Sequence, residues 1–530
     1  MKGMKRNIGT FALMMTGLGS IIGSGWLFGA WKAAKVAGPA AIWAWVIGMI
    51  AILFIGLTYA ELGAMFPQAG GMVRYGHFSH GSFLGFISGW ANWIAIVSVI
   101  PVEAVASIQY MSSWPWAWAK ALYNGETLSP IGVLLAACLV IVYFLINYWT
   151  VKLFARVNTA ITVFKFLIPG LTIFGLIYSG FHAHNFTHAP GGFTPNGWAG
   201  VLTAVATSGI VFAFNGFQSP INMAGEAKNP SRSVPIAVAG SIILAGIIYV
   251  LLQIAYIGAV PDHLLAKGWS VLNFSSPFAD LALALNLNWL ALLLFADAFV
   301  SPSGTGMTYT ATTARMIYGM EQNGYFPRIF GKIHPVYGVP RPAMWFNLAV
   351  SFLFLFMFRG WGSLAEVISV ATLISYVTGP ISVMAFRRMK DAKISRPLKI
   401  KGMPVIAPLA FIVASLILYW ATWPLTGQVT LIMMIGLPIY FYYQAKNNWK
   451  DFAANFKAGL WLVVYLIVMM GISYLGSSKF GGTNHLPYGV DMAVVVIAAL
   501  VFYFWGIHSA LPSYELEQNE ESEEQLKIAN

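Results

Sequence analysis

Residues 16–29 read TGLGSIIGSGWLFG and lie inside the first long apolar run of the chain. Five of these fourteen residues are glycine and two are serine, a composition that weakens a regular helix. A break in a membrane helix leaves backbone N–H and C=O groups without partners, so it is tolerated only where it is buried in protein or lines a polar cavity. The stretch therefore predicts an interrupted membrane helix that forms part of a binding site.

A second stretch of the same kind, SGIVFAFNGFQSPIN, spans residues 208–222 and follows the fifth apolar segment. Glycine is also common in membrane helices that pack closely, and for one stretch alone close packing is the simpler interpretation. Two broken helices at corresponding positions are instead typical of transporters built from two inverted repeats, which bind substrate where the breaks meet.

The composition is that of a membrane protein, with 58% hydrophobic and 9% charged residues, against about 25% charged residues in soluble domains. The first apolar run is too long for a signal peptide and lacks a small-residue cleavage site, so we expect it to be retained. We expect an all-α integral membrane fold with about fourteen transmembrane helices, at residues 8–35, 39–66, 82–112, 130–149, 156–179, 199–225, 233–259, 285–315, 342–358, 363–386, 404–424, 427–443, 458–476 and 489–509.

The formal net charge of +12 does not indicate nucleic-acid binding, because the basic residues follow the membrane topology. Most of the 30 Lys and Arg residues fall in loops on the side of the N-terminus, including the run RRMKDAKISRPLKIK at residues 387–401. By the positive-inside rule, this distribution predicts a multi-pass protein of the cell membrane with both termini in the cytoplasm.

The two broken helices would offer complementary chemistry. The N–H groups released at the start of a half-helix carry partial positive charge and suit a carboxylate. The carbonyl groups released at the end of a half-helix suit an ammonium group or a cation. Together they predict a site for the head group of an α-amino acid.

Four motifs carry a resemblance to a known family: GSIIGSGWLFG (19–29), YAELGAMFPQAGGMVRY (59–75), GEAKNPSRSVPIA (225–237) and ARMIYGMEQNGYFPRIF (314–330). On these motifs the chain resembles the amino acid–polyamine–organocation (APC) superfamily, and within it the bacterial aspartate–proton symporters. The resemblance implies the LeuT-type 5+5 inverted-repeat fold, in which helices 1 and 6 are broken.

On this basis the chain divides into three parts. Residues 1–445 would form a transporter core of twelve helices, with repeats at about 8–179 and 199–386. Residues 446–510 would add two transmembrane helices. Residues 511–530, which contain the run YELEQNEESEEQ, would form an acidic cytoplasmic tail without a packed structure.

The resemblance also implies a set of substrate contacts. The backbone amides expected to hold the α-carboxylate are those of Gly23, Ser24 and Gly25. The carbonyl groups expected to receive the α-ammonium group are those of Ile21, Phe212 and Asn215. The candidate aromatic gates are Phe212 and Phe214, although packing explains these two rings equally well.

Position 218 departs from the family pattern, because many relatives have an acidic residue there and this chain has Gln218. An amide can donate hydrogen bonds to a carboxylate, whereas a second carboxylate would repel it. We therefore expect the side chain of an acidic substrate to be bound by Asn215, Gln218, Asn92 and Ser24.

Lys165 lies well inside the fifth apolar segment, about nine residues or roughly 13 Å from Arg156. A charged residue in the membrane interior marks a functional site by default, and snorkelling to the membrane surface is the alternative. In proton-coupled relatives a lysine at this position takes the place of a sodium ion. The resemblance thus implies proton coupling by Lys165, with its ammonium group near Gly19 and the hydroxyl groups of Ser301, Ser303 or Thr305.

Four acidic residues are candidates for gating or ion pairing. Glu61 lies in the second motif, which favours a gate or a structural ion pair over substrate contact. Glu226 lies in the third motif, where we expect it to latch an inner gate. Glu103 and Asp297 either carry a proton or pair within the bundle, and we favour pairing because buried charges usually find a partner.

We expect no metal site, cofactor or catalytic centre. His182, His184 and His188 share one loop, but no carboxylate or cysteine completes a coordination set, so we expect a solvated loop. Cys138 is the only cysteine, which excludes an intrachain disulfide. The sequence contains no HExxH, GxSxG or GxxxxGK[ST] motif, which argues against a membrane hydrolase and an ATP-driven pump.

The sequence therefore predicts a secondary transporter that imports an amino acid with protons by alternating access. The resemblance favours L-aspartate, or L-glutamate, as the substrate. An amino-acid permease or exchanger of other selectivity is the nearest alternative, and a membrane enzyme or a channel is a more distant one. The expected partners are the amino acid, protons and the lipid bilayer, and no sequence feature indicates an oligomeric state.

Overall fold

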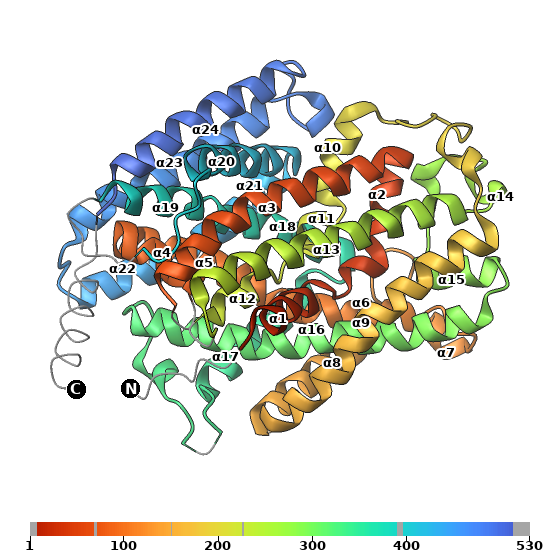
Figure 1. The fold of residues 1–530 in the computed structure, drawn as a ribbon, viewed down its shortest axis with the longest axis horizontal. Coiled ribbons are helices and arrows are strands. Elements are labelled where there is room, and N and C mark those ends of the chain that lie inside the picture. The colour runs from red at the N-terminus through yellow and green to blue at the C-terminus, as the bar shows by residue number, and fades with distance from the viewer. Residues whose placement is uncertain are drawn as a thin grey trace.

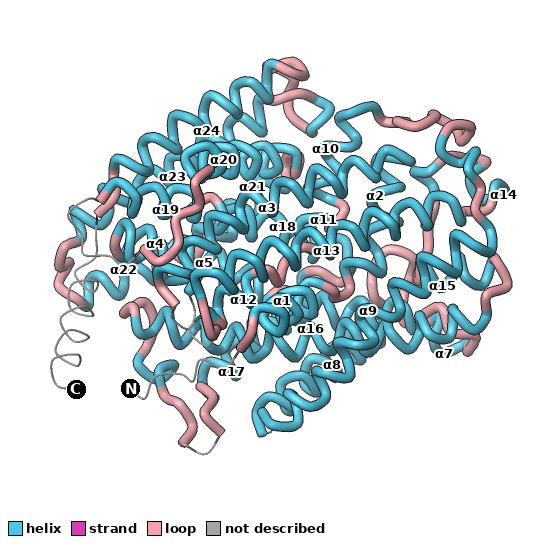
Figure 2. Tube along the Cα trace, viewed as in Figure 1, coloured by secondary structure: helices cyan, strands magenta, loops and turns pink. Residues whose placement is uncertain are grey.

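The computed structural model describes residues 8–67, 71–149, 151–224, 227–335, 337–389 and 396–511, with backbone alone at residues 151–160, 162 and 163. Within these ranges the chain forms helices and loops, with two isolated bridges as its only extended pairs (Figure 2). Glu226 and residues 512–530 of the expected acidic tail lie outside the described residues.

The described residues contain 24 α-helices. The first ten are α1 (Thr10–Ile21), α2 (Gly25–Ala37), α3 (Ala41–Met65), α4 (Gly71–His80), α5 (Ser82–Val97), α6 (Val99–Met111), α7 (Ala117–Lys120), α8 (Pro130–Trp149), α9 (Val151–Gly180) and α10 (Gly197–Thr207). The next seven are α11 (Ile210–Ala213), α12 (Gln218–Asn222), α13 (Pro230–Ala259), α14 (Asp262–Leu265), α15 (Pro277–Ala284), α16 (Asn288–Gln322) and α17 (Arg341–Met357). The last seven are α18 (Trp361–Tyr376), α19 (Thr378–Arg388), α20 (Met403–Trp420), α21 (Leu425–Met434), α22 (Leu437–Lys446), α23 (Phe452–Leu475) and α24 (Val490–His508).

The long helices lie side by side in one bundle, with α4 and α22 at one end and α7 and α14 at the other (Figure 1). Ten helical segments of the described chain are long and apolar enough to cross a membrane. Four shorter apolar helices accompany them, namely α1, α10, α17 and the part of α9 from Phe164 to Gly180. The all-helical membrane architecture is thus confirmed for the described residues, whereas the count of fourteen spanning helices and the inverted repeat stay predictions.

Large apolar side chains cover the outer surface of the bundle. Phe174, Leu292 and Ile435 are examples, with exposed fractions of 77%, 70% and 68%. Apolar surface of this kind is unfavourable in water, but it is well solvated by lipid tails, which provide no hydrogen bonds. The distribution therefore fits a bundle that is surrounded by lipid and keeps its polar side chains inside.

The first glycine-rich stretch is interrupted where the sequence predicts. Helix α1 ends at Ile21 and α2 begins at Gly25, so that Ile22, Gly23 and Ser24 form the first break. Helix α2 then bends at Gly38, whose φ of 62° is in the left-handed region, and the apolar segment continues through α3 to Met65.

The second glycine-rich stretch is interrupted twice. Helix α10 ends at Thr207, and Gly209 adopts a left-handed conformation with φ of 79°, which favours glycine. One short turn, α11, follows before residues 214–217 leave the helix, and the chain resumes helical geometry at Gln218. We call residues 214–217 the second break.

The segments on either side of the two breaks touch each other at glycines. A Cβ atom at Gly216, where φ is 122°, would lie 2.5 Å from the carbonyl carbon of Ser20, and one at Gly25 would lie 2.8 Å from Cβ of Ala213. Any larger residue would hold the two segments apart. Helix α13 packs on α1 and α3, and α16 packs on α6 and α9, so these helices surround the contact.

Candidate functional site

Lys165 projects from α9 to the first break, and only 2% of its side chain is exposed. Its Nζ donates hydrogen bonds to the carbonyl oxygen of Gly19 at 2.8 Å and to Oγ1 of Thr305 at 2.7 Å. Gly19 lies in the last turn of α1, where the carbonyl groups carry partial negative charge. The ammonium group therefore joins α9, α1 and α16 at the end of a broken helix.

The other two hydroxyl groups considered for Lys165 have different partners. Ser301 donates from Oγ to Oδ1 of Asp297 at 2.7 Å, one turn earlier in α16. Ser303 shares a hydrogen bond of 3.1 Å with the hydroxyl group of Tyr143. Ser303 is two residues from Thr305 and therefore faces another side of α16, and Ser301 is a full turn away. Of the three hydroxyl groups, that of Thr305 is the one that contacts Lys165.

Glu103 brings a carboxylate from α6 to the first break. Its Oε2 accepts the backbone N–H of Ser24 at 2.8 Å, and the side chain is 1% exposed. This N–H lies at the start of α2, where a helix favours negative charge. The other oxygen, Oε1, has no hydrogen-bond partner among the described residues.

Gly23 makes room for two of these groups. A Cβ atom at this position would lie 2.7 Å from Oε1 of Glu103 and 3.0 Å from Oγ1 of Thr305. Since Thr305 also accepts the hydrogen bond from Lys165, the carboxylate and the ammonium group approach the break from neighbouring positions. A side chain at position 23 would displace one of them.

Tyr249 of α13 links the two broken segments. Its hydroxyl oxygen lies 3.1 Å from the carbonyl oxygen of Ile21 and 3.0 Å from that of Ala213. The hydroxyl proton is thus within hydrogen-bond distance of a carbonyl group on each segment. The sequence argument missed this residue, because a tyrosine in an apolar helix equally suits packing or a membrane interface.

A small cavity lies where these groups meet. It is lined by Ser20, Ile21, Gly23, Gly25, Val99, Glu103, Phe212, Ala213, Asn215, Thr305 and Tyr309. Its volume of about 10 Å³ corresponds to a single water molecule. The two broken segments are thus closed on each other, and an amino acid fits only if they separate.

Four of the six backbone groups expected to bind an amino-acid head group, those of Ile21, Gly23, Ser24 and Phe212, have internal partners. The N–H of Gly23 donates to the carbonyl oxygen of Ile21 at 3.0 Å, and that of Ser24 donates to Glu103. The carbonyl oxygen of Phe212 accepts the N–H of Asn215 at 3.0 Å. A bound head group would have to exchange with these partners.

Asn215 and Gln218 are joined by a chain of hydrogen bonds. The amide nitrogen of Gln218 donates to the hydroxyl oxygen of Tyr376 at 2.7 Å, and this hydroxyl donates to Oδ1 of Asn215 at 3.1 Å. The amide nitrogen of Asn215 donates to Oγ1 of Thr372 at 3.2 Å. Tyr376 and Thr372 lie on α18, which the sequence argument did not associate with the site.

The other two residues expected to bind an acidic side chain lie apart from this chain of hydrogen bonds. Ser24 accepts a hydrogen bond of 2.9 Å on its Oγ from the indole nitrogen of Trp361. Asn92 lies on α5 and is 1% exposed, and its amide atoms have no hydrogen-bond partner in the described part of the chain.

The two candidate aromatic gates differ in position. Phe212 lines the cavity, and its ring centroid lies 5.8 Å from that of Trp361. Phe214 is fully buried and packs against Tyr249 and Trp45, with ring centroids 5.4 and 6.1 Å away. Phe214 therefore packs in the core, which is the alternative that the sequence left open for this ring.

The remaining acidic candidates lie in different environments. Glu61, at the end of α3, forms an ion pair with Arg387 of α19, with both carboxylate oxygens 2.7 Å from guanidinium nitrogens. Glu61 also accepts the N–H of Ile400 at 2.9 Å, so it fastens the chain after α19. Asp297 is fully buried, and its Oδ2 has no hydrogen-bond partner among the described residues.

Comparison with known proteins identifies the family. The profile of the amino acid permease family matches residues 8–443. The chain is 67% identical over 530 residues to the glutamate/serine transporter AimA of Bacillus subtilis, covering 99% of this chain and 98% of that one. It is 37% identical over 520 residues to the aspartate-proton symporter of Bacillus subtilis, covering 97% and 98%. It is 27% identical over 456 residues to the branched-chain amino acid permease BcaP of the same organism, covering 84% and 95%.

The family match spans both breaks and every residue that lines the cavity. The three relatives are named as transporters or permeases and not as enzymes. The chain therefore belongs to the amino acid permease family of the APC superfamily, and it is an amino acid transporter rather than an enzyme.

Proposed function

We propose that this transporter imports an acidic amino acid, L-glutamate or L-aspartate, together with protons by alternating access. The observation that carries the proposal is the placement of Lys165 on Gly19 and Thr305, at the end of broken helix α1. A lysine in this position supplies a positive charge that a transporter coupled to sodium would take from a bound ion. The positive charge of a side chain thus stands where a coupling ion would bind.

The choice of substrate rests on the relatives and on the polar groups near the breaks. One relative is named for glutamate and serine, and another for aspartate. The identity to the glutamate/serine transporter is higher than that to the aspartate-proton symporter, and this supports glutamate ahead of aspartate. The sequence alone had favoured aspartate. The amide groups of Asn215 and Gln218 can donate hydrogen bonds to a side-chain carboxylate.

Serine is the second candidate substrate. The amide of Gln218 carries no charge, so it can bind a carboxylate or a hydroxyl group without electrostatic penalty. Its present partner is a hydroxyl group, that of Tyr376. The hydroxyl group of serine could therefore take the place of the Tyr376 hydroxyl group on Gln218, just as the carboxylate of an acidic substrate could.

Glu103 supplies the step that couples a proton to substrate binding in this proposal. Its carboxylate occupies the N–H of Ser24, which is one of the amides expected to hold the substrate α-carboxylate. On protonation, Glu103 loses the negative charge that the start of α2 favours. The N–H of Ser24 is then released to the substrate, so that proton and amino acid enter together and one carboxylate replaces another.

We place both termini of the chain in the cytoplasm and the protein in the cell membrane, because basic residues concentrate in the loops on the N-terminal side. With this orientation the end of the bundle that holds α4 and α22 faces the cytoplasm, and the end that holds α7 and α14 faces outward (Figure 1).

Transport by the purified protein in proteoliposomes tests the proposal. Labelled glutamate and aspartate should accumulate when the outside is more acidic than the inside and sodium is absent. One pH unit provides about 1.4 kcal/mol per proton, which supports about tenfold accumulation. Serine is measured as the second candidate and leucine as the control. A requirement for sodium would contradict proton coupling, and failure of both acidic amino acids to enter or compete would contradict the substrate.

Replacement of Lys165 by alanine should abolish accumulation against the gradient, because no group remains to carry the positive charge at the end of α1. At one pH unit the loss should be about tenfold. The control is Lys120→Ala, which removes an exposed lysine from α7. If a well-folded Lys165→Ala protein still concentrates substrate, Lys165 has no coupling role.

The variant Glu103→Gln should take up substrate almost independently of external pH. The amide keeps an oxygen that can accept the N–H of Ser24, but it cannot bind a proton in the relevant pH range. Asp297→Asn provides the comparison, since it neutralises another buried carboxylate, and it should retain the pH dependence. The opposite pattern, with pH dependence lost only in Asp297→Asn, would assign the proton to Asp297.

The variant Gln218→Glu should lower uptake of glutamate relative to serine, because a carboxylate at this position repels an acidic side chain. A repulsion of about 1.4 kcal/mol would change the uptake ratio about tenfold. Gln428→Glu, which adds the same charge at an exposed position on α21, serves as the control. An unchanged glutamate-to-serine ratio would show that Gln218 does not contribute to selectivity.

A further inference from the structure

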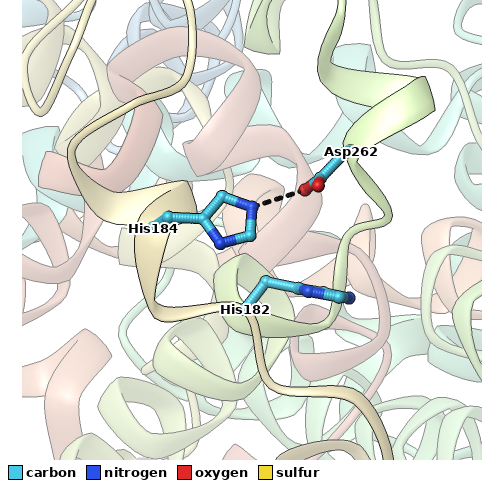
Figure 3. A group of neighbouring side chains, drawn as sticks. All are labelled: His182, His184 and Asp262. Atoms are coloured by element: carbon cyan, nitrogen blue, oxygen red, sulfur yellow. Dashed lines mark hydrogen bonds and ion pairs between the residues drawn. The ribbon is translucent and has the colours of Figure 1, made fainter.

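Three potential metal ligands meet at the end of the bundle that holds α14. They are His182, His184 and Asp262, and one ligand atom from each lies within 4.8 Å of the others. Nε2 of His184 lies 2.7 Å from Oδ1 of Asp262, and the rings of His182 and His184 have centroids 5.5 Å apart. Figure 3 shows His184 directed at Asp262, with His182 beside them.

Asp262 supplies the carboxylate that the sequence argument found missing. The histidines follow α9, whereas Asp262 is the first residue of α14, 78 positions after His184. The cluster is not visible in the sequence, because 78 positions separate His184 from Asp262. The packing of α9 and of the histidine loop on α13 brings these residues together.

The two loops are held in register by buried hydrogen bonds. The side chain of Asn185 is 2% exposed, and its amide nitrogen donates to the carbonyl oxygens of Ile257 at 2.9 Å and Val260 at 2.8 Å. The backbone N–H of His182 donates to the carbonyl oxygen of Gly258 at 2.7 Å. These bonds dock the histidine loop on the C-terminal end of α13, directly before Asp262, and so hold the backbones that carry the three ligands close together.

The ligand set selects a class of metal. Two imidazole nitrogens and one carboxylate oxygen suit Zn²⁺, and they suit Mg²⁺ and Ca²⁺ poorly because those ions prefer oxygen ligands. Bonds of about 2.0–2.2 Å would bring the ligand atoms to roughly 3.4 Å from one another. The side chains of His184 and Asp262 are 47% and 66% exposed, which leaves them free to rotate into that geometry. A water molecule would take the fourth position.

We propose that His182, His184 and Asp262 bind one Zn²⁺ ion, which ties the loop after α9 to the segment after α13 and thereby slows transport. Helix α9 carries Lys165 and helix α13 carries Tyr249, and both side chains contact the first broken segment. A metal that joins the ends of these helices restrains any movement of one relative to the other. The binding part of this inference stands independently of the proposed substrate and of proton coupling.

Zinc binding is measured on the purified full-length chain, with any histidine tag removed, by competition with a chromogenic zinc chelator. One zinc ion per chain should bind, and His184→Ala and Asp262→Asn should each weaken binding at least about tenfold, as expected for the loss of a ligand. The controls are His188→Ala, in the same loop, and His485→Ala, on another exposed loop, and neither should change the affinity. Equal binding by all four variants, or no binding by the parent chain, would overturn the site.

The effect on transport is measured separately in proteoliposomes, with zinc added on both sides of the membrane. Zinc should slow uptake by the parent chain and by His188→Ala, a chelator should restore it, and His184→Ala should be insensitive. Zinc that binds at the three ligands without slowing uptake would overturn the restraint while leaving the site. Absence of acidic amino-acid uptake by the parent chain without zinc would refute the proposed function, and the chelator measurement would still decide the site.

Discussion

The interior of a membrane offers no water to the backbone groups that a broken helix releases, and the organisation of this transporter follows from how those groups are satisfied. The partners come from three other helices, α6, α13 and α9. The hydrogen bonds are Ser24 N–H to Glu103, Tyr249 to the carbonyl groups of Ile21 and Ala213, and Lys165 to the carbonyl group of Gly19. Two of the three side chains, a carboxyl group and an amine, would be costly in their charged forms if they stood alone in the membrane. The breaks and the buried charges therefore stabilise each other.

These hydrogen bonds also suit a site in which the carboxylate of a substrate can replace the carboxylate of Glu103. A carboxylate on the N–H of Ser24 is the chemical equivalent of the α-carboxylate of an amino acid, so the substrate can replace Glu103 without changing the kind of interaction. Lys165 remains on the other side of Thr305 and keeps the end of α1 neutralised during the exchange. In the proposed coupling, a proton that binds to Glu103 links the release of the Ser24 N–H to substrate entry, and no further ion has to enter the cavity.

Much of this arrangement could be predicted from the sequence, because glycine-rich interruptions and a lysine in an apolar segment are local signals. Both breaks were predicted at their positions, and the approach of Lys165 to Gly19 followed from the resemblance to the family. The partners of the breaks could not be predicted in the same way. Tyr249 and Trp361 carry no signal until helix packing sets their depth, and Glu103 could not be matched to Ser24 before α6 was placed beside the break. The choice between gating and packing for Phe214 depended on where its ring lies, and the sequence did not show that it packs against Tyr249 and Trp45.

The glycine contacts indicate how the closed site opens. The broken segments touch at Gly216 and Gly25, where the backbones approach without interlocking side chains, so separation there requires no side chain to be withdrawn from a packed core. The hydrogen bonds that join the two segments include that of Ser219 to Ser20 at 2.8 Å and those of Tyr249, whose hydroxyl group lies within reach of both segments. In the proposed binding mode an amino acid would compensate for part of this loss, because its ammonium group would donate to the carbonyl oxygen of Ile21, which Tyr249 would release. The proposed substrate would thereby replace a hydrogen bond that opening removes, and the cavity of about 10 Å³ would expand around it while that carbonyl group stays paired.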